Sequence, residues 1–252
     1  MKYHIGFSQS DLGTNAPQTV ILSGEPERSH YIAQTYLENI KLLSQYRGLN
    51  SYLGNLANGK PMLVATSGMG APSLSIVVNE LVQVGIKRFI RVGTCGSIQP
   101  SVNVGDIVIS QASLCRQGTA LDIAPPEYPA VADPFLTVAL VETARQLDIP
   151  YHLGLTASVD SFYEGQERVD SANPRLQPWL QGITESYRQL NILNYEMEVG
   201  TLFKMAGVYG FQAACVCAVV AQRTTAESIM LADKEATVQK AISVAMETVA
   251  QN

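Results

Sequence analysis

Three side-chain types that can bind a planar heterocycle lie together at residues 162–168. The amide of Gln166 can donate one hydrogen bond and accept another, and the guanidinium of Arg168 can donate to a carbonyl or to a developing negative charge. The ring of Phe162 offers a surface for ring packing. These groups suit a planar heterocycle such as uracil, in which an N–H donor lies between two carbonyl acceptors. Taken alone, however, such a segment is more typical of a polar surface loop.

Three arginines lie close in sequence to glycine-containing turns. Arg28 follows Gly24, Arg91 precedes Thr94, and Arg47 lies between them in the chain. A phosphate needs donors that converge from several directions, and a glycine turn lets backbone N–H groups approach it. These five residues are therefore a candidate phosphate site. The alternative is three unrelated surface arginines.

Two carboxylates, Glu196 and Glu198, stand two residues apart at 194–198, which read Asn-Tyr-Glu-Met-Glu. If the segment is a strand, both side chains lie on the same face, because side chains alternate along a strand. Paired carboxylates on one face indicate glycosyl chemistry, either as acid and base or as acceptors for sugar hydroxyls. The alternative is a pair of solvated charges at a strand end.

The elements that must position these groups follow from the apolar pattern. Strands are predicted at 19–23, 61–66, 88–92, 106–112, 152–158 and 211–220, and helices at 26–37, 72–84, 134–147, 198–209 and 232–249. This alternation predicts a single α/β domain over residues 1–252, with a central mixed, largely parallel sheet flanked by helices. Glycine turns at 23–24, 67–70 and 93–96 follow predicted strands, where ligands bind in such sheets.

The composition restricts the classes of partner. Of the 252 residues, 46% are hydrophobic and 15% are charged, enough for a sizeable core, and the net charge is −5. Without a basic patch we expect no binding to nucleic acid, and without a long apolar run we expect no membrane span. The N-terminal residues show no signal-peptide pattern, so the four cysteines are expected to be reduced in the cytoplasm.

Several cofactor motifs are missing from the sequence. There is no G-x-G-x-x-G fingerprint and no Walker lysine, so neither a nicotinamide cofactor nor nucleotide triphosphate hydrolysis is indicated. Cys215 and Cys217 have no local Cys or His that would complete a metal site. We interpret them as small core residues.

Four segments together resemble the nucleoside phosphorylase superfamily, and most closely its uridine phosphorylase branch. Residues 67–76, which begin Ser-Gly-Met-Gly-Ala-Pro-Ser, resemble the family's signature segment. Residues 91–96 resemble its phosphate and ribose turn, 194–198 its ribose-binding motif, and 162–168 the uracil-reading segment of the uridine branch. The similarity extends from residues 3–6 to the C-terminal helix and so covers nearly the whole chain. The combination of motifs is far more specific than any single motif.

The resemblance implies a role for each matching residue. It assigns phosphate to Gly24, Arg28, Arg47, Arg91 and Thr94, ribose to His4, Thr94, Glu196, Met197 and Glu198, and the base to Phe162, Gln166, Arg168 and Arg223. Among these, Arg91, Thr94, Arg168 and Glu198 would take part in catalysis. His4 and Arg47 would enter the site of a neighbouring subunit in a homo-oligomer built from dimers, usually a hexamer in this family.

The resemblance also separates the classes of base. Purine phosphorylases of this fold place an aspartic acid after the late core strand to protonate the leaving base. Residues 218–223 read Ala-Val-Val-Ala-Gln-Arg here and contain no acid. Uracil can leave as an anion whose charge spreads over its carbonyls, where Arg168 can stabilise it. The chain is therefore interpreted as a pyrimidine enzyme.

The implied activity is pentosyl transfer in pyrimidine salvage: reversible phosphorolysis of uridine, and possible use of deoxyuridine or thymidine. Inorganic phosphate would be the co-substrate, with no metal or organic cofactor. Two departures from the family lie directly after assigned residues, one after Arg47 and one after Thr94. Gly48 stands where some relatives have a glutamate that helps to bind a monovalent cation, and Cys95 stands where uridine-branch members often have threonine.

Three other functions stay open at this point. A purine nucleoside phosphorylase is disfavoured by the missing acid and by the Gln166–Arg168 pair. A nucleoside hydrolase of the same fold would have no use for the three arginines. A non-catalytic nucleoside-binding protein could keep the base pocket without them.

Overall fold

The computed structural model describes the backbone of residues 1–224, 227–229 and 234–251. The strands are β1 (Thr19–Ser23), β2 (Glu38–Ser44), β3 (Ser51–Asn55), β4 (Pro61–Thr66), β5 (Arg88–Ser97), β6 (Ile107–Arg116), β7 (Tyr151–Val159), β8 (Ile192–Glu196), β9 (Gln212–Arg223) and β10 (Glu227–Ile229). The helices are α1 (Pro26–Tyr36), α2 (Ala71–Gln83), α3 (Gly118–Ile123), α4 (Pro134–Gln146), α5 (Ile183–Gln189), α6 (Val199–Tyr209) and α7 (Lys234–Gln251). Short 3₁₀ turns occur at Gln9–Leu12, Tyr46–Gly48 and Pro178–Leu180.

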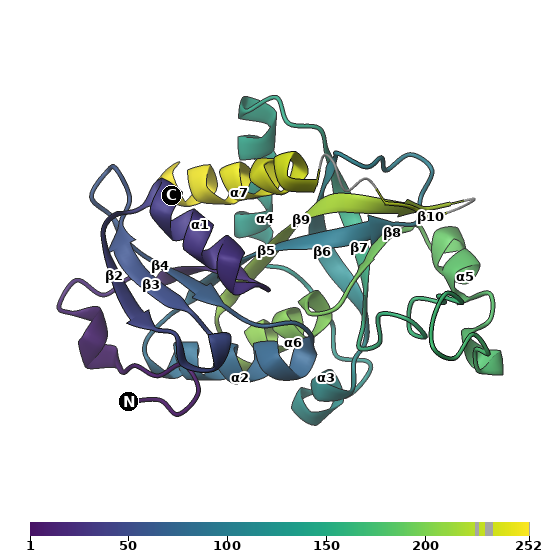
Figure 1. Ribbon diagram of the computed structural model, residues 1–252, viewed down its shortest axis with the longest axis horizontal. Helices are drawn as coiled ribbons and strands as arrows, with labels where there is room; N and C mark the ends of the chain where they lie inside the picture. The colour runs from purple at the N-terminus through teal and green to yellow at the C-terminus, as the bar shows by residue number, and fades with distance from the viewer. Residues whose placement is uncertain (225–226, 230–233, 252) are drawn as a thin grey trace.

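Within these ranges the ten strands join into one mixed sheet, in the order β10-β9-β6-β7-β8-β5-β1-β4-β3-β2 (Figure 1). Parallel pairs link β4, β1, β5 and β9, and also β6, β7 and β8. Because β9 pairs with β5 as well as β6, and β5 with β8, five strands close into a ring. The predicted mixed α/β sheet is confirmed, with its parallel strands in the centre.

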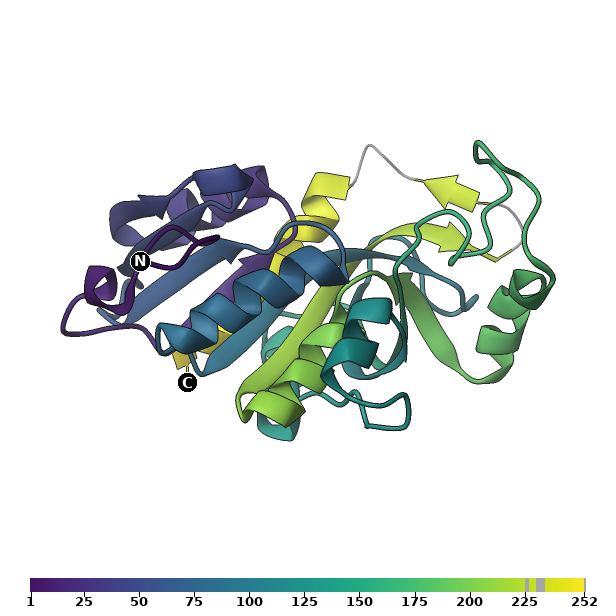
Figure 2. The same cartoon turned by 90° about the horizontal axis from the view of Figure 1, so that it is seen from below.

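Helices cover the sheet on two sides. In Figure 1, α1, α4 and α7 lie above the strands, and α2, α3 and α6 lie below them. Figure 2 shows the lower layer face-on, with α2 in blue beside α6 in light green, and these two helices pack against each other. No helix in the described ranges has both the length and the apolar composition that crossing a membrane requires.

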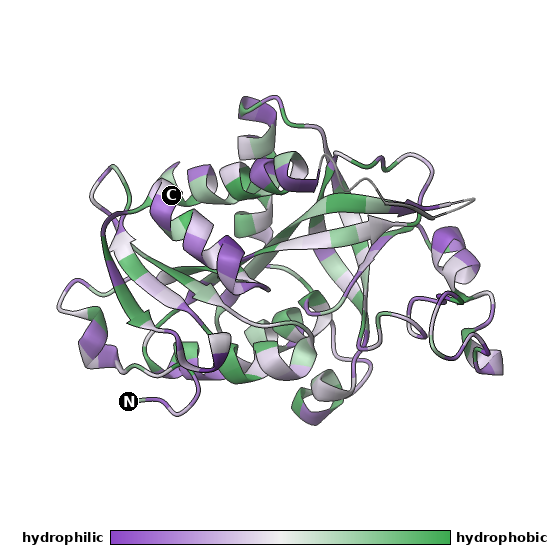
Figure 3. Cartoon of the chain, in the orientation of Figure 1, coloured by the Kyte–Doolittle hydropathy of each residue, from purple (hydrophilic) through white to green (hydrophobic). Residues whose placement is uncertain are grey.

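The central strands are buried on both faces because the helical layers lie on both sides. Val20 and Leu22 of β1 face the cluster shared with α2 and α6, whereas Ile21 between them faces the cluster shared with α1, α4 and α7. Hydrophobic residues accordingly follow the central strands in Figure 3. Cys215 and Cys217 of β9 are fully buried, as expected for core residues, and their Sγ atoms lie 3.6 Å apart.

The strong apolar patterns predicted the central elements well. The predicted strands 19–23 and 61–66 match β1 and β4, and all five predicted helices occur with small shifts at their ends. Residues 232–233 of the last predicted helix lie outside the described residues. The sequence analysis missed β2, β3, β10, α3 and α5, which are short or half-exposed, and it considered a strand at 194–198, where β8 ends.

One predicted turn is wrong. Residues 93–96 continue strand β5, where they pair with both β8 and β9. Gly93 serves close packing there, because a Cβ atom at this position would lie only 2.9 Å from Cys217 Sγ. The glycine therefore marks a close approach of two strands.

Candidate functional site

A cavity of about 290 Å³ lies where strands β1, β5, β8 and β9 end. Ten of the residues predicted from the sequence line it: Gly24, Arg28, Arg91, Thr94, Phe162, Gln166, Arg168, Glu196, Met197 and Glu198. Three predicted residues, His4, Arg47 and Arg223, are not among the residues that line it. Segments that are distant in sequence thus meet at the ends of the parallel strands β1, β5 and β9, as expected for an α/β sheet, and at the end of β8, which is antiparallel to β5.

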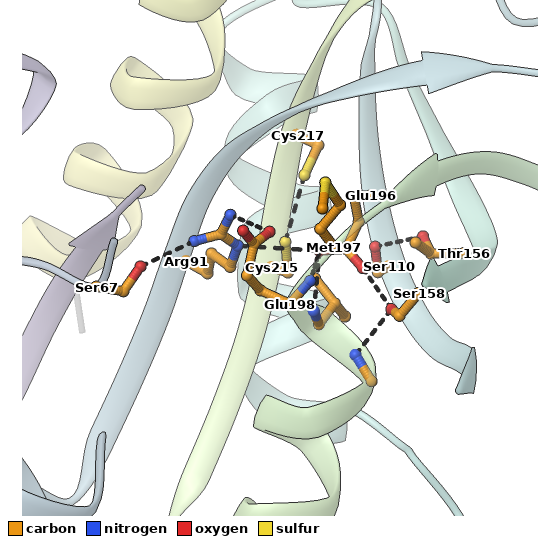
Figure 4. A network of polar contacts seen from close by, with 12 residues as sticks. Ser67, Arg91, Ser110, Thr156, Ser158, Glu196, Met197, Glu198, Cys215 and Cys217 are labelled. Atoms are coloured by element: carbon orange, nitrogen blue, oxygen red, sulfur yellow. Dashed lines mark hydrogen bonds and ion pairs between the residues drawn. The ribbon is translucent and has the colours of Figure 1, made fainter. Parts of the chain in front are cut away.

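Arg91 is the most deeply buried cation of the site. Its Nη2 atom donates to Glu198 Oε2 over 2.6 Å, and its Nη1 atom donates to Ser67 Oγ over 3.3 Å (Figure 4). Burial alone would lower the pKa of Arg91, but the carboxylates of Glu198 and Glu196 outweigh it and raise the pKa above its usual value. Arg91 is therefore a permanent positive charge on the cavity wall.

Arg28 provides a second cation at the same end of the cavity. Its Nη2 atom pairs with Glu25, and its Nη1 atom donates to the carbonyl of Val92 over 3.4 Å. Burial lowers the pKa of Arg28, and the carboxylate of Glu25 opposes that shift. Within the described chain, the buried Nε atoms of Arg28 and Arg91 have no hydrogen-bond acceptor. Both arginines line the cavity, so two positive charges lie where an anion can bind.

The two carboxylates differ from the prediction in their backbone setting. Only Glu196 belongs to a strand, as the last residue of β8, whereas Glu198 is the N-cap of α6 with φ −141° and ψ −29°. The prediction that strand alternation places both on one face is therefore wrong. Both nevertheless approach Arg91, because the chain bends at Met197: Glu196 Oε2 lies 4.0 Å from Arg91 Nε.

Glu198 presents its carboxylate to the cavity, and Glu196 turns its carboxylate to the backbone. Glu198 Oε1 accepts from the Gly70 N–H over 2.6 Å. Glu196 Oε2 accepts from the N–H groups of Glu198 and Val199 over 2.8 and 2.9 Å, and Ser158 donates to Glu196 Oε1 (Figure 4). Burial, followed by repulsion from Glu198, raises the pKa of Glu196 to about 8.

The other end of the cavity carries the aromatic, amide and guanidinium groups predicted to lie together. The Arg168 guanidinium carbon lies 4.0 Å from the centre of the Phe162 ring, a cation–π contact. Arg168 Nη2 donates to Gln166 Oε1 over 3.4 Å, and Gln166 is buried. Arg223 lies behind this group, 5.7 Å from the centre of the Tyr195 ring, and its Nη2 donates to the Glu167 carbonyl.

His4 and Arg47 lie together on a different surface. His4 Nδ1 is 2.7 Å from Glu80 Oε1, and its ring packs edge-on against Tyr3 at 4.8 Å between centres. Arg47 lies over the rings of Tyr3 and Tyr46, at 5.7 and 5.3 Å from their centres. Within one chain neither side chain reaches the cavity, so any contribution to a site must be made to another subunit.

Comparison with known proteins agrees with this geometry. The family model described as "Phosphorylase superfamily" matches residues 18–251. The chain belongs to the phosphorylase superfamily. Its resemblance to the uridine branch is confirmed as well: the uridine phosphorylase of Salmonella typhimurium is 42% identical over 89% of this chain and 87% of its own length.

Two further relatives show the breadth of this superfamily. The uridine phosphorylase of Thermococcus kodakarensis is 39% identical over 94% of this chain and 83% of its own length. A DeoD-type purine nucleoside phosphorylase of Oceanobacillus iheyensis is 33% identical over 99% of both chains. Membership of the phosphorylase superfamily therefore does not by itself distinguish a pyrimidine from a purine base, and the residues of the cavity have to be considered as well.

The cavity also contains residues that the sequence analysis did not assign. These cavity residues are Glu25, Met69, Cys95, Gly96, Tyr195, Val220 and Ala221. Val220 enters through a bulge: Cys95 pairs with Val219 and Gly96 with Ala221, so Val220 is the extra residue of β9. The motif spacing gives no signal for such a bulge. Within the described ranges, no three Asp, Glu, His or Cys side chains gather closely enough to ligate a metal ion.

Proposed function

We propose that the chain catalyses the reversible phosphorolysis of uridine to uracil and α-ribose 1-phosphate. The observation that supports this best is that one cavity joins an arginine pair, a carboxylate able to bind a diol, and an amide beside a guanidinium. Glu198 links the first two groups through its bond to Arg91. Similarity to proteins named uridine phosphorylase supports the choice of uridine.

Phosphate binds beside Arg28 and Arg91 in this proposal. An anion oxygen would satisfy their buried Nε donors, which have no acceptor in the described chain. Gly24 lies close to Arg91, because a Cβ atom there would be 3.7 Å from Arg91 Nη2, and Thr94 lines the same cavity. Arg47 of a neighbouring subunit would add a third cation.

Ribose binds at Glu198 and Met197. Each carboxylate oxygen of Glu198 can accept more than one hydrogen bond. Glu198 can therefore bind the 2′ and 3′ hydroxyls and still keep its ion pair with Arg91. Binding of sugar and phosphate is thereby coupled through one ion pair. Thr94 completes the ribose contacts, and His4 of a neighbouring subunit would bind the 5′ hydroxyl.

Glu196 has a supporting role in this scheme. Its oxygens accept hydrogen bonds from two backbone N–H groups and from Ser158. These bonds hold in place the turn that carries Met197 and Glu198, which we call the ribose-binding turn. A carboxyl group whose hydrogen bonds are committed to the backbone is poorly placed to transfer a proton to substrate. We therefore assign no acid–base step to the Glu196–Glu198 pair.

The base is held by Phe162, Gln166 and Arg168, and it binds beside the contact of Arg168 with the Phe162 ring, since 4.0 Å leaves no space for a base between them. Gln166 pairs with a carbonyl and the ring N–H of uracil, and Arg168 donates to a carbonyl, with Arg223 behind the base. As the glycosidic bond breaks, negative charge spreads onto the uracil carbonyls and Arg168 stabilises it. No proton donor to the leaving base is then required.

The chemical step follows from these positions. Phosphate held by the arginines attacks the anomeric carbon on the face opposite the base. The sugar becomes oxocarbenium-like, the phosphate charge beside it stabilises that state, and the configuration inverts. Every bond change involves only nucleoside and phosphate, so the proposal needs no metal, organic cofactor or covalent intermediate.

We infer that the active form is a homo-oligomer whose smallest unit is a two-fold dimer, with a hexamer as the full assembly. The support is that His4 and Arg47 lie near each other on a surface away from the cavity of their own chain. We further propose that the enzyme acts on free nucleosides in the cytoplasm.

A panel of nucleosides tests the choice of base. Uridine, deoxyuridine, thymidine, inosine and adenosine are each incubated with enzyme and phosphate, and free base is measured by chromatography. We expect rapid uracil release and poor release of hypoxanthine and adenine, because residues 218–223 provide no acid for a purine. Faster turnover of inosine than of uridine would reject the pyrimidine assignment.

A further inference from the structure

The turn that carries Met197 and Glu198 is held by side chains from other elements. At the start of α6, the N–H groups of Glu198 and Val199 bond to Glu196, and the N–H of Gly200 donates to Ser158 Oγ over 2.8 Å. All these groups would otherwise be unsatisfied donors of a buried helix N-terminus.

The next N–H of this helix is bonded by Gln117, a residue that neither the motifs nor the cavity lining includes. Gln117 Oε1 accepts from both the N–H and the Oγ1 of Thr201, each over 2.9 Å. Gln117 Nε2 donates to the carbonyl of Met197 over 2.6 Å. The side chain is 2% exposed, so water cannot replace these bonds without a rearrangement.

The two backbone groups that Gln117 joins are four residues apart. In a continuing α-helix the N–H of Thr201 would bond directly to the carbonyl of Met197. The amide of Gln117 instead inserts between them and satisfies both. The helix therefore begins at Val199, and Glu198 keeps the non-helical φ of −141° that lets its carboxylate reach Gly70 N and Arg91.

We propose that Gln117 is a positioning residue that sets the geometry of the ribose-binding turn by inserting its amide between Met197 O and Thr201 N. The inference rests on the proposed function, because it assigns the ribose hydroxyls to Met197 and Glu198. Its consequence is selective. Loss of the amide should weaken contacts with the sugar diol more than contacts with the base or the phosphate.

Gln117→Met tests this role with a side chain of similar length that forms neither bond. We expect kcat/KM for uridine to fall roughly tenfold to a hundredfold, the scale of a small misplacement of a binding group. The decrease for 2′-deoxyuridine should be several-fold smaller, because that substrate has one hydroxyl fewer to misplace. The diagnostic quantity is therefore the ratio of kcat/KM for the two substrates.

Lys204→Met is the matched control, since it also removes buried polar contacts of α6. Lys204 Nζ donates to the carbonyls of Pro125 and Pro126 and does not contact the ribose-binding turn. We expect it to lower the melting temperature by an amount comparable to Gln117→Met and to leave the substrate ratio unchanged.

Gln117→Glu provides a second, pH-dependent test. When protonated, the introduced carboxyl group can still donate to the Met197 carbonyl, whereas its ionised form would repel that carbonyl. Activity of this variant relative to wild type should therefore be highest at low pH and fall as the pH rises. Equal losses for both substrates in Gln117→Met, or a flat relative pH profile in Gln117→Glu, would reject the positioning role alone. Absence of uridine phosphorolysis in the wild type would reject the proposed function together with it.

Discussion

Replacement of Arg91 by methionine removes the cation that lies between two buried carboxylates. Arg91 Nη2 is 2.6 Å from Glu198 Oε2, and Arg91 Nε is 4.0 Å from Glu196 Oε2. All three side chains are at most 6% exposed. Methionine fills a similar volume, so the main effect is the loss of charge compensation for Glu198.

The expected cost can be estimated from the burial. Removal of one partner of a buried ion pair typically costs about 3–5 kcal/mol. We expect about 3 kcal/mol, the lower end of this range, because Glu198 keeps its hydrogen bond from the Gly70 N–H after Arg91 is removed. For a chain of this size, that corresponds to a fall in melting temperature of roughly 6–12 °C.

The assay is thermal unfolding at neutral pH, followed by circular dichroism, for wild type, Arg91→Met, Glu198→Gln and the double variant. The double variant should be more stable than Arg91→Met, because it no longer buries an uncompensated charge. Arg88→Met is the control: Arg88 lies on the same strand, is only half-buried, and has no ion pair within the described residues. A double variant that is less stable than Arg91→Met, or a fall of less than about 2 °C in Arg91→Met itself, would refute the reasoning.

Three further outcomes are expected. The pKa of Glu196 is raised to about 8 from 4.5, so between these values the folded state holds a proton that the unfolded state releases. The stability of wild type relative to Glu196→Gln, measured by urea unfolding, should therefore fall as the pH rises from about 5 to 8. A stability difference that stays constant over this range would contradict the raised pKa. Arg168→Ala should lower kcat for uridine roughly a hundredfold or more with a smaller change in KM, because negative charge reaches the base only as the glycosidic bond breaks. Near-normal turnover of uridine by this variant would show that Arg168 takes no part in catalysis. Co-expressed Arg47→Ala and Arg168→Ala chains should recover roughly a quarter of wild-type activity, since half the dimers would hold one intact site. A mixture as inactive as its parents would contradict the contribution of Arg47 to the partner's site.

The central fold could be predicted because its elements carry strong local signals. Long apolar runs mark β1, β4 and the buried part of β9, and proline occupies the first turn of α1, α2 and α4. The short strands β2 and β3 lack such a pattern: β2 is mostly exposed, and two irregularities interrupt its pairing with β3. Tertiary pairing rather than local sequence defines these strands.

The site, too, could be predicted only in part from the sequence. The resemblance to the family predicted ten of the residues that line the cavity, and the convergence of strand ends in an α/β sheet explains why Gly24 and Thr94 lie near each other. The spacing could not show that the chain leaves strand geometry at Met197, since that bend depends on Glu196, Ser158 and Gln117. Nor could it place Val220, which enters the cavity through a bulge in the pairing of β9 with β5.

The fate of phosphate tests the proposed reaction most directly. Enzyme and uridine are incubated with and without inorganic phosphate, uracil release is followed by absorbance, and the phosphorus product is identified by ³¹P NMR. The two arginines with unused buried donors predict that uracil appears only when phosphate is present, in equal amount with α-ribose 1-phosphate. Release of uracil at the same rate without phosphate, with free ribose as the product, would contradict the account and indicate a hydrolase.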